Sequence, residues 1–213
     1  MLKKIEIFIV DDSEDWLRVI SESVNRERDL KVIGIAANKE DTINYIRQND
    51  VDVILLGANL RCNSYDGIDV LVDIMGMKKD IKVIMVTSLK NEELIKKSFL
   101  AGAVNYVLKD DYLELPDIIR KTHRENLAFG VILRGYRELL RDKYIKIETT
   151  LTPCEKELLD KKQEGFSNRE LAERLNKSES TIKSQTRSIL KKFNGKSLKE
   201  VITVRNILNN IKY

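Results

Sequence analysis

The chain has 213 residues, of which 42% are hydrophobic and 34% are charged, and its formal net charge is +4. This composition excludes a disordered or low-complexity chain and leaves enough apolar residues for two cores. Glu6 interrupts the N-terminal apolar run and Asp11 ends it, too early for a signal peptide or a membrane span, so we expect a cytoplasmic protein with no membrane partner.

The charge is divided unevenly along the chain. Residues 1–125 carry a net charge of −4, whereas residues 126–213 carry +8. A clustered basic surface indicates a polyanionic partner. We therefore predict an N-terminal domain over 1–122, a partly helical linker over 123–147, and a basic C-terminal domain over 148–213.

Short apolar runs, each followed by a helix-like segment, recur in the first domain. Strands that are apolar on both faces and alternate with helices predict an α/β doubly wound, five-stranded parallel sheet. The first helix has Ser13 as an expected N-cap and an apolar stripe of Trp16, Val19, Ile20 and Val24. The third has Ile68, Leu71, Val72 and Met75. The expected strands are Ile5–Val10, Lys31–Ala36, Val51–Leu56, Ile81–Val86 and Val104–Leu108.

Residues suited to ligand chemistry stand where several of these strands end. Asp11 and Asp12 close the first strand, Gly57 the third, Thr87 the fourth and Lys109 the fifth. Singly, each could be a cap, a turn residue or a solvated side chain. Because the carboxyl ends of parallel strands meet at one edge, we expect them to share one crevice.

This set, with Asp66-Gly67 after a loop and Tyr106 on the last strand, resembles the flavodoxin-like receiver domain of two-component response regulators over residues 5 to 122. In that family the paired acids bind Mg²⁺ and a strand-end aspartate is phosphorylated. A Thr or Ser hydroxyl and a Lys then hold the phosphoryl group, and an aromatic residue rotates. The resemblance implies these last roles for Thr87, Lys109 and Tyr106.

Gly57 departs from the family pattern, because it stands where the phosphorylated aspartate is expected. A glycine has no side chain to form an acyl phosphate, so the crevice is interpreted as a degenerate acidic pocket. We expect no cofactor and weak Mg²⁺ binding at most, with Asp12 and the carbonyl of Asn59 as the remaining ligands that the resemblance implies. The loop from Arg61 to Tyr65 is longer than is typical of the family.

The cysteines and the histidine offer no metal-ligand spacing. Cys62 and Cys154 fall in different predicted domains, and His123 is the only histidine. We expect two free thiols and a solvated His123.

The C-terminal domain is marked by helix caps. Thr152 with Glu155, Ser167 with Glu170, and Ser197 with Glu200 each have capping-box spacing, and Ser178 is a further N-cap. Helices are therefore predicted to begin at about 153, 168, 179 and 198, giving an all-α four-helix domain. Only Asn176-Lys177-Ser178 separates the second helix from the third, which suits a helix-turn-helix.

The third of these helices has one apolar and one polar face. Ile182, Ile189, Leu190 and Phe193 are expected to be buried, which turns Lys183, Ser184, Arg187 and Lys191 outward together. A face of this kind suits the major groove of double-stranded DNA.

Residues 151–202 are similar to the LuxR-type helix-turn-helix, in particular at Leu151-Thr152-Pro153, Glu170–Leu175 and Ser178–Lys183. The resemblance implies base contacts from Lys183, Ser184 and Arg187. It implies DNA-backbone contacts from Thr181 and Lys191, and a homodimer formed through the last helix. The receiver is a further candidate for the dimer contact. Gln185 stands where a histidine is common.

Three hypotheses for function follow. The first is a NarL/LuxR-type transcription regulator that acts independently of aspartyl phosphorylation, with Lys109 in an ion cluster with Asp11 and Asp12 that holds one conformation. The second is a DNA-binding regulator controlled by a small molecule or partner protein in the empty pocket. The third, a Mg²⁺-dependent phosphohydrolase, is disfavoured because adjacent acids project to different sides of a strand, so we expect no enzyme.

Overall fold

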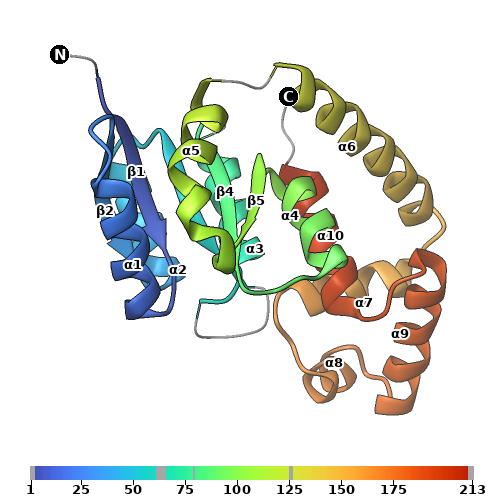
Figure 1. Ribbon diagram of the computed structural model, residues 1–213. Helices are drawn as coiled ribbons and strands as arrows, with labels where there is room; N and C mark the ends of the chain where they lie inside the picture. Colours follow the sequence, from blue (N-terminus) through green and yellow to red (C-terminus); the bar gives the residue numbers. More distant parts are fainter. Residues whose placement is uncertain (1–2, 61–65, 79, 125–126, 211–213) are drawn as a thin grey trace. The chain divides into compact units, whose positions relative to one another are not determined.

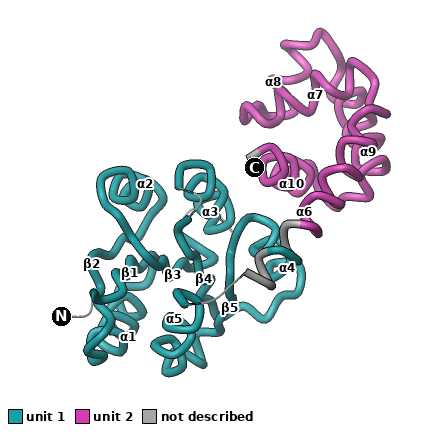
Figure 2. Tube along the Cα trace, turned by 90° about the horizontal axis from the view of Figure 1, so that it is seen from above, with its two compact units in different colours: residues 1–134, 210–213 teal, residues 135–209 magenta. Residues whose placement is uncertain are grey.

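The computed structural model describes residues 3–60, 66–78, 80–124 and 127–210 (Figure 1). The chain forms two compact units, one of residues 1–134 with 210–213 and one of residues 135–209, which Figure 2 draws in different colours. Within the described ranges, no helix has both the length and the apolar character needed to cross a membrane.

The first unit is built on a parallel sheet with the strand order β2-β1-β3-β4-β5. This is the doubly wound α/β sheet that the sequence predicts. Valine, isoleucine and leucine fill the strand interiors, and all five residues of β3 are buried. The strands are β1 (Ile5–Val10), β2 (Leu30–Ala36), β3 (Val53–Gly57), β4 (Lys82–Thr87) and β5 (Asn105–Leu108).

Helices cover both faces of this sheet (Figure 1). Helix α1 (Glu14–Asn25) contacts α5 (Leu115–Arg124) on one face. On the other face, α3 (Asp66–Met77) contacts both α2 (Lys39–Gln48) and α4 (Glu92–Ala101). A short 3₁₀ helix, η1 (Lys109–Glu114), joins β5 to α5.

The buried face of α1 differs in part from the prediction. Ser13 is the N-cap, as expected, and accepts a hydrogen bond from the Trp16 N–H at 3.4 Å. Leu17, Ile20 and Val24 are the buried residues, whereas Trp16 and Val19 are only half-buried. Leu17, Ile20 and Val24 follow one another at spacings of three and four residues, so they share one face of the helix. Trp16 and Val19 lie at the edges of that face. In α3, Ile68, Leu71 and Val72 are buried as predicted, and Met75 is half-buried.

The second unit contains the four predicted helices, and each begins at the predicted residue. Thr152 and Ser167 both form complete capping boxes. At the last helix, the Ser197 hydroxyl accepts from the Glu200 N–H at 3.1 Å, while the Glu200 carboxylate accepts from the Lys196 N–H at 2.8 Å. The helices are α7 (Pro153–Gln163), α8 (Asn168–Arg174), α9 (Glu179–Phe193) and α10 (Leu198–Asn210).

Helix α6 (Leu127–Glu148) is continuous through both of its glycines. Its last turns pack within the second unit. The Tyr144 ring lies 4.8 Å from that of Phe193, and Glu148 forms a 2.9 Å ion pair with Arg205 of α10. The C-terminal part of α6 therefore belongs to the helical core that supports α9.

Candidate functional site

The sheet order brings the sequence-predicted polar residues to one edge. Asp11 follows β1, Gly57 ends β3, Thr87 ends β4, and Lys109 follows β5. The strand register pairs Gly57 with Val86 and Thr87 with Leu108, so these ends lie at the same level. The residues expected at the carboxyl edge of the sheet are therefore brought together there.

A buried ion pair lies at the centre of this crevice. The Lys109 Nζ lies 2.7 Å from Asp11 Oδ2, and the two side chains are 11% and 3% exposed. The other Asp11 oxygen accepts a hydrogen bond from the Ser13 N–H at 3.0 Å. Both carboxylate oxygens of Asp11 are thus engaged, which a charge removed from water requires.

The Asp11 carboxylate lies against Gly57. A Cβ added at Gly57 would stand 2.9 Å from Asp11 Oδ2 and 3.2 Å from the Val10 carbonyl oxygen. Any side chain at position 57 would therefore displace the carboxylate that pairs with Lys109. The Asp11 carboxylate partly occupies the space that the side chain of an aspartate at position 57 would need.

Main-chain atoms form another wall of the crevice. The Gly67 N–H donates to the Ala58 carbonyl at 3.0 Å, and a Cβ at Gly67 would stand 2.1 Å from the Gly57 carbonyl oxygen. The Asp66 carboxylate accepts from the Leu60 N–H at 2.6 Å. The start of α3 is thereby held directly against the end of β3, and glycine is required at position 67.

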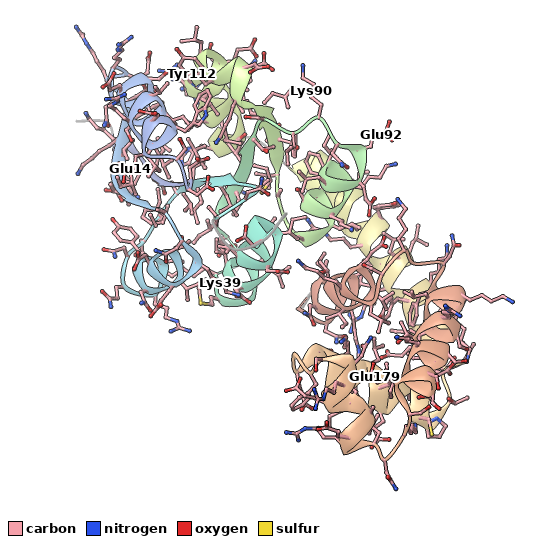
Figure 3. All side chains as sticks on the ribbon, turned by 90° about the horizontal axis from the view of Figure 1, so that it is seen from below. Glu14, Lys39, Lys90, Glu92, Tyr112 and Glu179 are labelled. Carbon is pink, nitrogen blue, oxygen red and sulfur yellow. The ribbon has the colours of Figure 1, made fainter. Side chains whose placement is uncertain are left out.

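Two aromatic rings extend the environment of Lys109. Its ammonium lies 5.2 Å from the centroid of Trp16, whose ring meets Tyr112 edge-on with centroids 5.9 Å apart. Tyr112 is labelled in Figure 3. A cation near an aromatic face is attracted by the quadrupole of the ring. Trp16 was predicted only as part of the core, since nothing in its local sequence pattern pointed to Lys109.

Thr87 and Tyr106 both hold the segment that follows β4. The Thr87 hydroxyl, buried with its residue 4% exposed, accepts from the Leu89 N–H at 3.2 Å. The Tyr106 hydroxyl donates to the Leu89 carbonyl at 2.6 Å. One residue of this loop therefore connects the two side chains that the receiver resemblance assigns to switching.

The predicted ion cluster is a pair. Among the described carboxylates, Lys109 pairs with Asp11 and not with Asp12, which is half-buried and has no bonded partner in the described ranges. Adjacent residues on an extended chain project to opposite sides, so one lysine reaches only one of the two acids. The expectation of a three-membered cluster was wrong in this respect.

The donor set fits Mg²⁺ poorly. Asp11 is committed to Lys109, Gly57 supplies no side-chain oxygen, and Asn59 lies two residues beyond the end of β3. In the part of the chain that the structure describes, no three His, Cys, Asp or Glu side chains are grouped to hold a metal. Cys154 is an exposed free thiol and His123 is exposed, whereas Cys62 and the loop Arg61–Tyr65 lie outside the described residues.

The polar face of α9 is as predicted. Lys183, Ser184, Arg187 and Lys191 are all exposed, whereas Ile182 and Ile189 are buried and Leu190 and Phe193 are half-buried. Thr181 is exposed, and its hydroxyl lies 2.8 Å from that of the N-cap Ser178. Figure 3 labels Glu179, the first residue of this helix. Gln185 is bonded to Lys177 across the turn at 3.3 Å.

Glu155 is a buried residue whose tertiary contacts the sequence analysis missed. Its carboxylate, in a residue 4% exposed, accepts from the Thr152 N–H at 2.7 Å, the Lys192 ammonium at 2.6 Å and the Ser188 hydroxyl at 2.7 Å. Burial raises the pKa of Glu155, but the hydrogen bonds from Lys192, Ser188 and Thr152 outweigh it and lower the pKa to about 2. Capping-box spacing identifies only the Thr152 contact.

The fold and the two sites define a two-domain regulatory protein. Residues 7–120 match the family described as "Response regulator receiver domain", and residues 149–205 match "Bacterial regulatory proteins, luxR family". The chain belongs to the response regulators that join a receiver domain to a LuxR-type helix-turn-helix domain, the NarL/LuxR group. It is a DNA-binding transcription regulator of this type.

Similar proteins cover nearly the whole chain. The Bacillus subtilis protein YxjL, described as an uncharacterized transcriptional regulatory protein, is 30% identical over 95% of this chain and 96% of its own. The response regulator protein VraR of Staphylococcus aureus is 28% identical over 88% and 90%. A structure of Salmonella typhimurium RcsB covers 100% of both chains at 23% identity with a TM-score of 0.56, which shows a common fold.

Proposed function

We propose that this protein binds its operator as a homodimer without aspartyl phosphorylation, and that its receiver serves as a fixed structural and dimerisation module. The observation that carries the proposal is the Asp11–Lys109 ion pair at 2.7 Å beside Gly57. In the family, covalent phosphate at the strand end biases the receiver between two conformations. Because Gly57 offers no acceptor, phosphate cannot attach there and cannot shift the equilibrium between the two conformations.

The buried pair favours a single conformation. In a receiver that has an acceptor carboxylate, the lysine has a further anionic partner. Here Lys109 has Asp11 as its partner, and separating two buried charges is costly. The hydrogen bonds of Thr87 and Tyr106 to the main chain of Leu89 also favour a single conformation of the loop after β4.

Recognition of DNA is assigned to the polar face of α9. Lys183, Ser184 and Arg187 are proposed to contact base edges, and Thr181 and Lys191 to contact phosphates. The fold likeness to RcsB, which is described in complex with DNA, supports this assignment. In a two-fold dimer the recognition helices would be about 34 Å apart, one turn of the duplex.

The test combines mass spectrometry with DNA binding. The full-length protein is incubated with acetyl phosphate and Mg²⁺, its intact mass is measured, and its affinity for its own upstream region is titrated at two salt concentrations. We expect no phosphoryl adduct, unchanged affinity, and a steep salt dependence from phosphate contacts. The Gly57→Asp variant serves as the acceptor-containing control. A wild-type adduct that raises affinity would refute the proposal.

Control by a ligand in the crevice is a second possibility, and Asp12 is the feature that favours it. Its half-buried carboxylate has no bonded partner in the described ranges. The position of Asp11 and Lys109 within the crevice argues against a large ligand. A metabolite or Mg²⁺ that bound there would raise the melting temperature of the wild type and not of Asp12→Asn.

A further inference from the structure

Two residues of α9 are bonded to one buried carboxylate of α7. Ser188 and Lys192 are four residues apart, so they lie in one row along α9. Both bind Glu155, at 2.7 Å and 2.6 Å, and the Lys192 ammonium also donates to the Thr150 carbonyl at 2.9 Å. The start of α7 is therefore bonded to this row of α9, in which Ser188 is exposed and Lys192 is half-buried.

Arg187 and Lys191 form the neighbouring row, and both are exposed. Each precedes a residue bonded to Glu155 by one position, and successive residues of an α-helix are about 100° apart around its axis. Fixing the direction of Ser188 and Lys192 therefore fixes that of Arg187 and Lys191.

Apolar packing also acts on α9, and the half-buried Leu190 and Phe193 contribute to it. In the described part of the chain, Ile182 and Ile189 are the buried hydrophobic residues of α9. Hydrophobic contacts are non-directional, whereas hydrogen bonds weaken steeply when their angles change. The bonds to Glu155 supply the directional restraint.

We propose that Glu155 is a positioning residue for DNA recognition: through Ser188 and Lys192 it sets the rotation of α9 and hence the direction of Arg187 and its neighbours. The inference rests on the proposed recognition of DNA by α9. It also removes Lys192 from the cations available to DNA, because its ammonium is bound to Glu155 and Thr150.

Loss of the bonds to Glu155 should reduce the preference of the protein for its operator sequence. Bidentate contacts to base edges need an accurately placed side chain, whereas contacts to phosphates are less demanding in direction. Releasing α9 from Glu155 should therefore weaken binding to the operator more than binding to unrelated DNA.

The test is Glu155→Gln in the full-length protein, titrated against its own upstream region and against a scrambled duplex at one salt concentration. We expect operator affinity to fall about tenfold or more, and affinity for the scrambled duplex to change less than about threefold. Glu157→Gln is the matched control, because Glu157 is exposed on the same helix. Equal losses on both duplexes, or no loss, would overturn the inference.

Two further variants separate positioning from folding. Ser188→Ala removes one hydrogen bond and retains the ion pair, so the same selective loss should appear in smaller size. The double variant Glu155→Gln with Lys192→Gln replaces the ion pair by two amides that can bond to each other, and it should recover preference relative to Glu155→Gln. Failure of the wild type to distinguish the two duplexes would contradict the proposed function, whereas preference retained in Glu155→Gln contradicts only this inference.

Discussion

The Lys109 ammonium lies 2.7 Å from Asp11 Oδ2, and the same oxygen would lie 2.9 Å from a Cβ at residue 57. One carboxylate oxygen therefore does two things. It neutralises the buried lysine, and it occupies space that an acceptor side chain would need. Variants at Gly57 and at the Asp11–Lys109 pair separate these roles.

Gly57→Asp should restore an acceptor at the cost of stability. The new side chain must displace Asp11, and overfilling a packed site costs roughly 1–3 kcal/mol. A third carboxylate should also strengthen Mg²⁺ binding and permit a phosphoryl adduct from acetyl phosphate. Intact mass and Mg²⁺ titration measure both effects. Gly57→Asn, which has similar bulk and no nucleophilic oxygen, should lose stability without gaining an adduct; an adduct on this control would place the phosphoryl group elsewhere.

Breaking the Asp11–Lys109 pair from either side should destabilise the receiver. Asp11→Asn or Lys109→Met leaves one buried charge without its partner, with an expected cost of about 3 kcal/mol in the free energy of unfolding. The double variant should lose less than the two single losses combined. Trp16 is the only tryptophan of the chain and lies 5.2 Å from the Lys109 ammonium, so its fluorescence follows unfolding of this unit. Additive losses would mean that the ion pair contributes little.

Stability of the helical unit should fall at low pH because of Glu155. Its pKa is lowered from the ordinary 4.5 to about 2 in the folded protein, so the unfolded chain takes up the proton first as the pH falls. The contribution is therefore complete above pH 4.5 and is lost as the pH falls through about 2. Glu155→Gln should lower the free energy of unfolding by about 2 kcal/mol at neutral pH and flatten its pH dependence in that window. Unfolding is measured by far-ultraviolet circular dichroism. A curve parallel to that of Glu157→Gln would contradict this prediction.

Substitutions on α9 should separate base contacts from phosphate contacts. Arg187→Ala should cost about 1–3 kcal/mol at the operator and relax base preference there. Lys191→Ala should weaken binding to all sequences alike and reduce the salt slope by about 1. Lys199→Ala, at an exposed lysine of α10, is the control of equal charge. If Arg187→Ala left affinity and preference unchanged, the assigned face of α9 would be incorrect.

Local sequence patterns predicted the helices of the second unit and the sheet of the first. Caps such as Thr152 and Ser167 act within one turn, so the starts of α7 and α8 could be identified without tertiary information. Strand ends were displaced by one or two residues, as at β3, because they depend on hydrogen bonds to neighbouring strands.

Pairings between distant residues could not be predicted to the same extent. The carboxyl ends of parallel strands had to meet, so Asp11 and Lys109 were expected in one crevice. Which of the two adjacent acids binds the lysine depends on the pleat of β1 and the position of η1, which the sequence does not specify. Glu155 and Lys192 are 37 positions apart and are joined only by the packing of α7 against α9.

The close approach of Gly67 to the Gly57 carbonyl involves the main chain of residue 57 and not its side chain. A side chain at position 67 would collide with that oxygen at 2.1 Å, so the main chains of α3 and β3 meet directly at this point. Exchange of residue 57 leaves this junction untouched. The junction between β3 and α3 is therefore expected to form whether or not residue 57 carries a side chain.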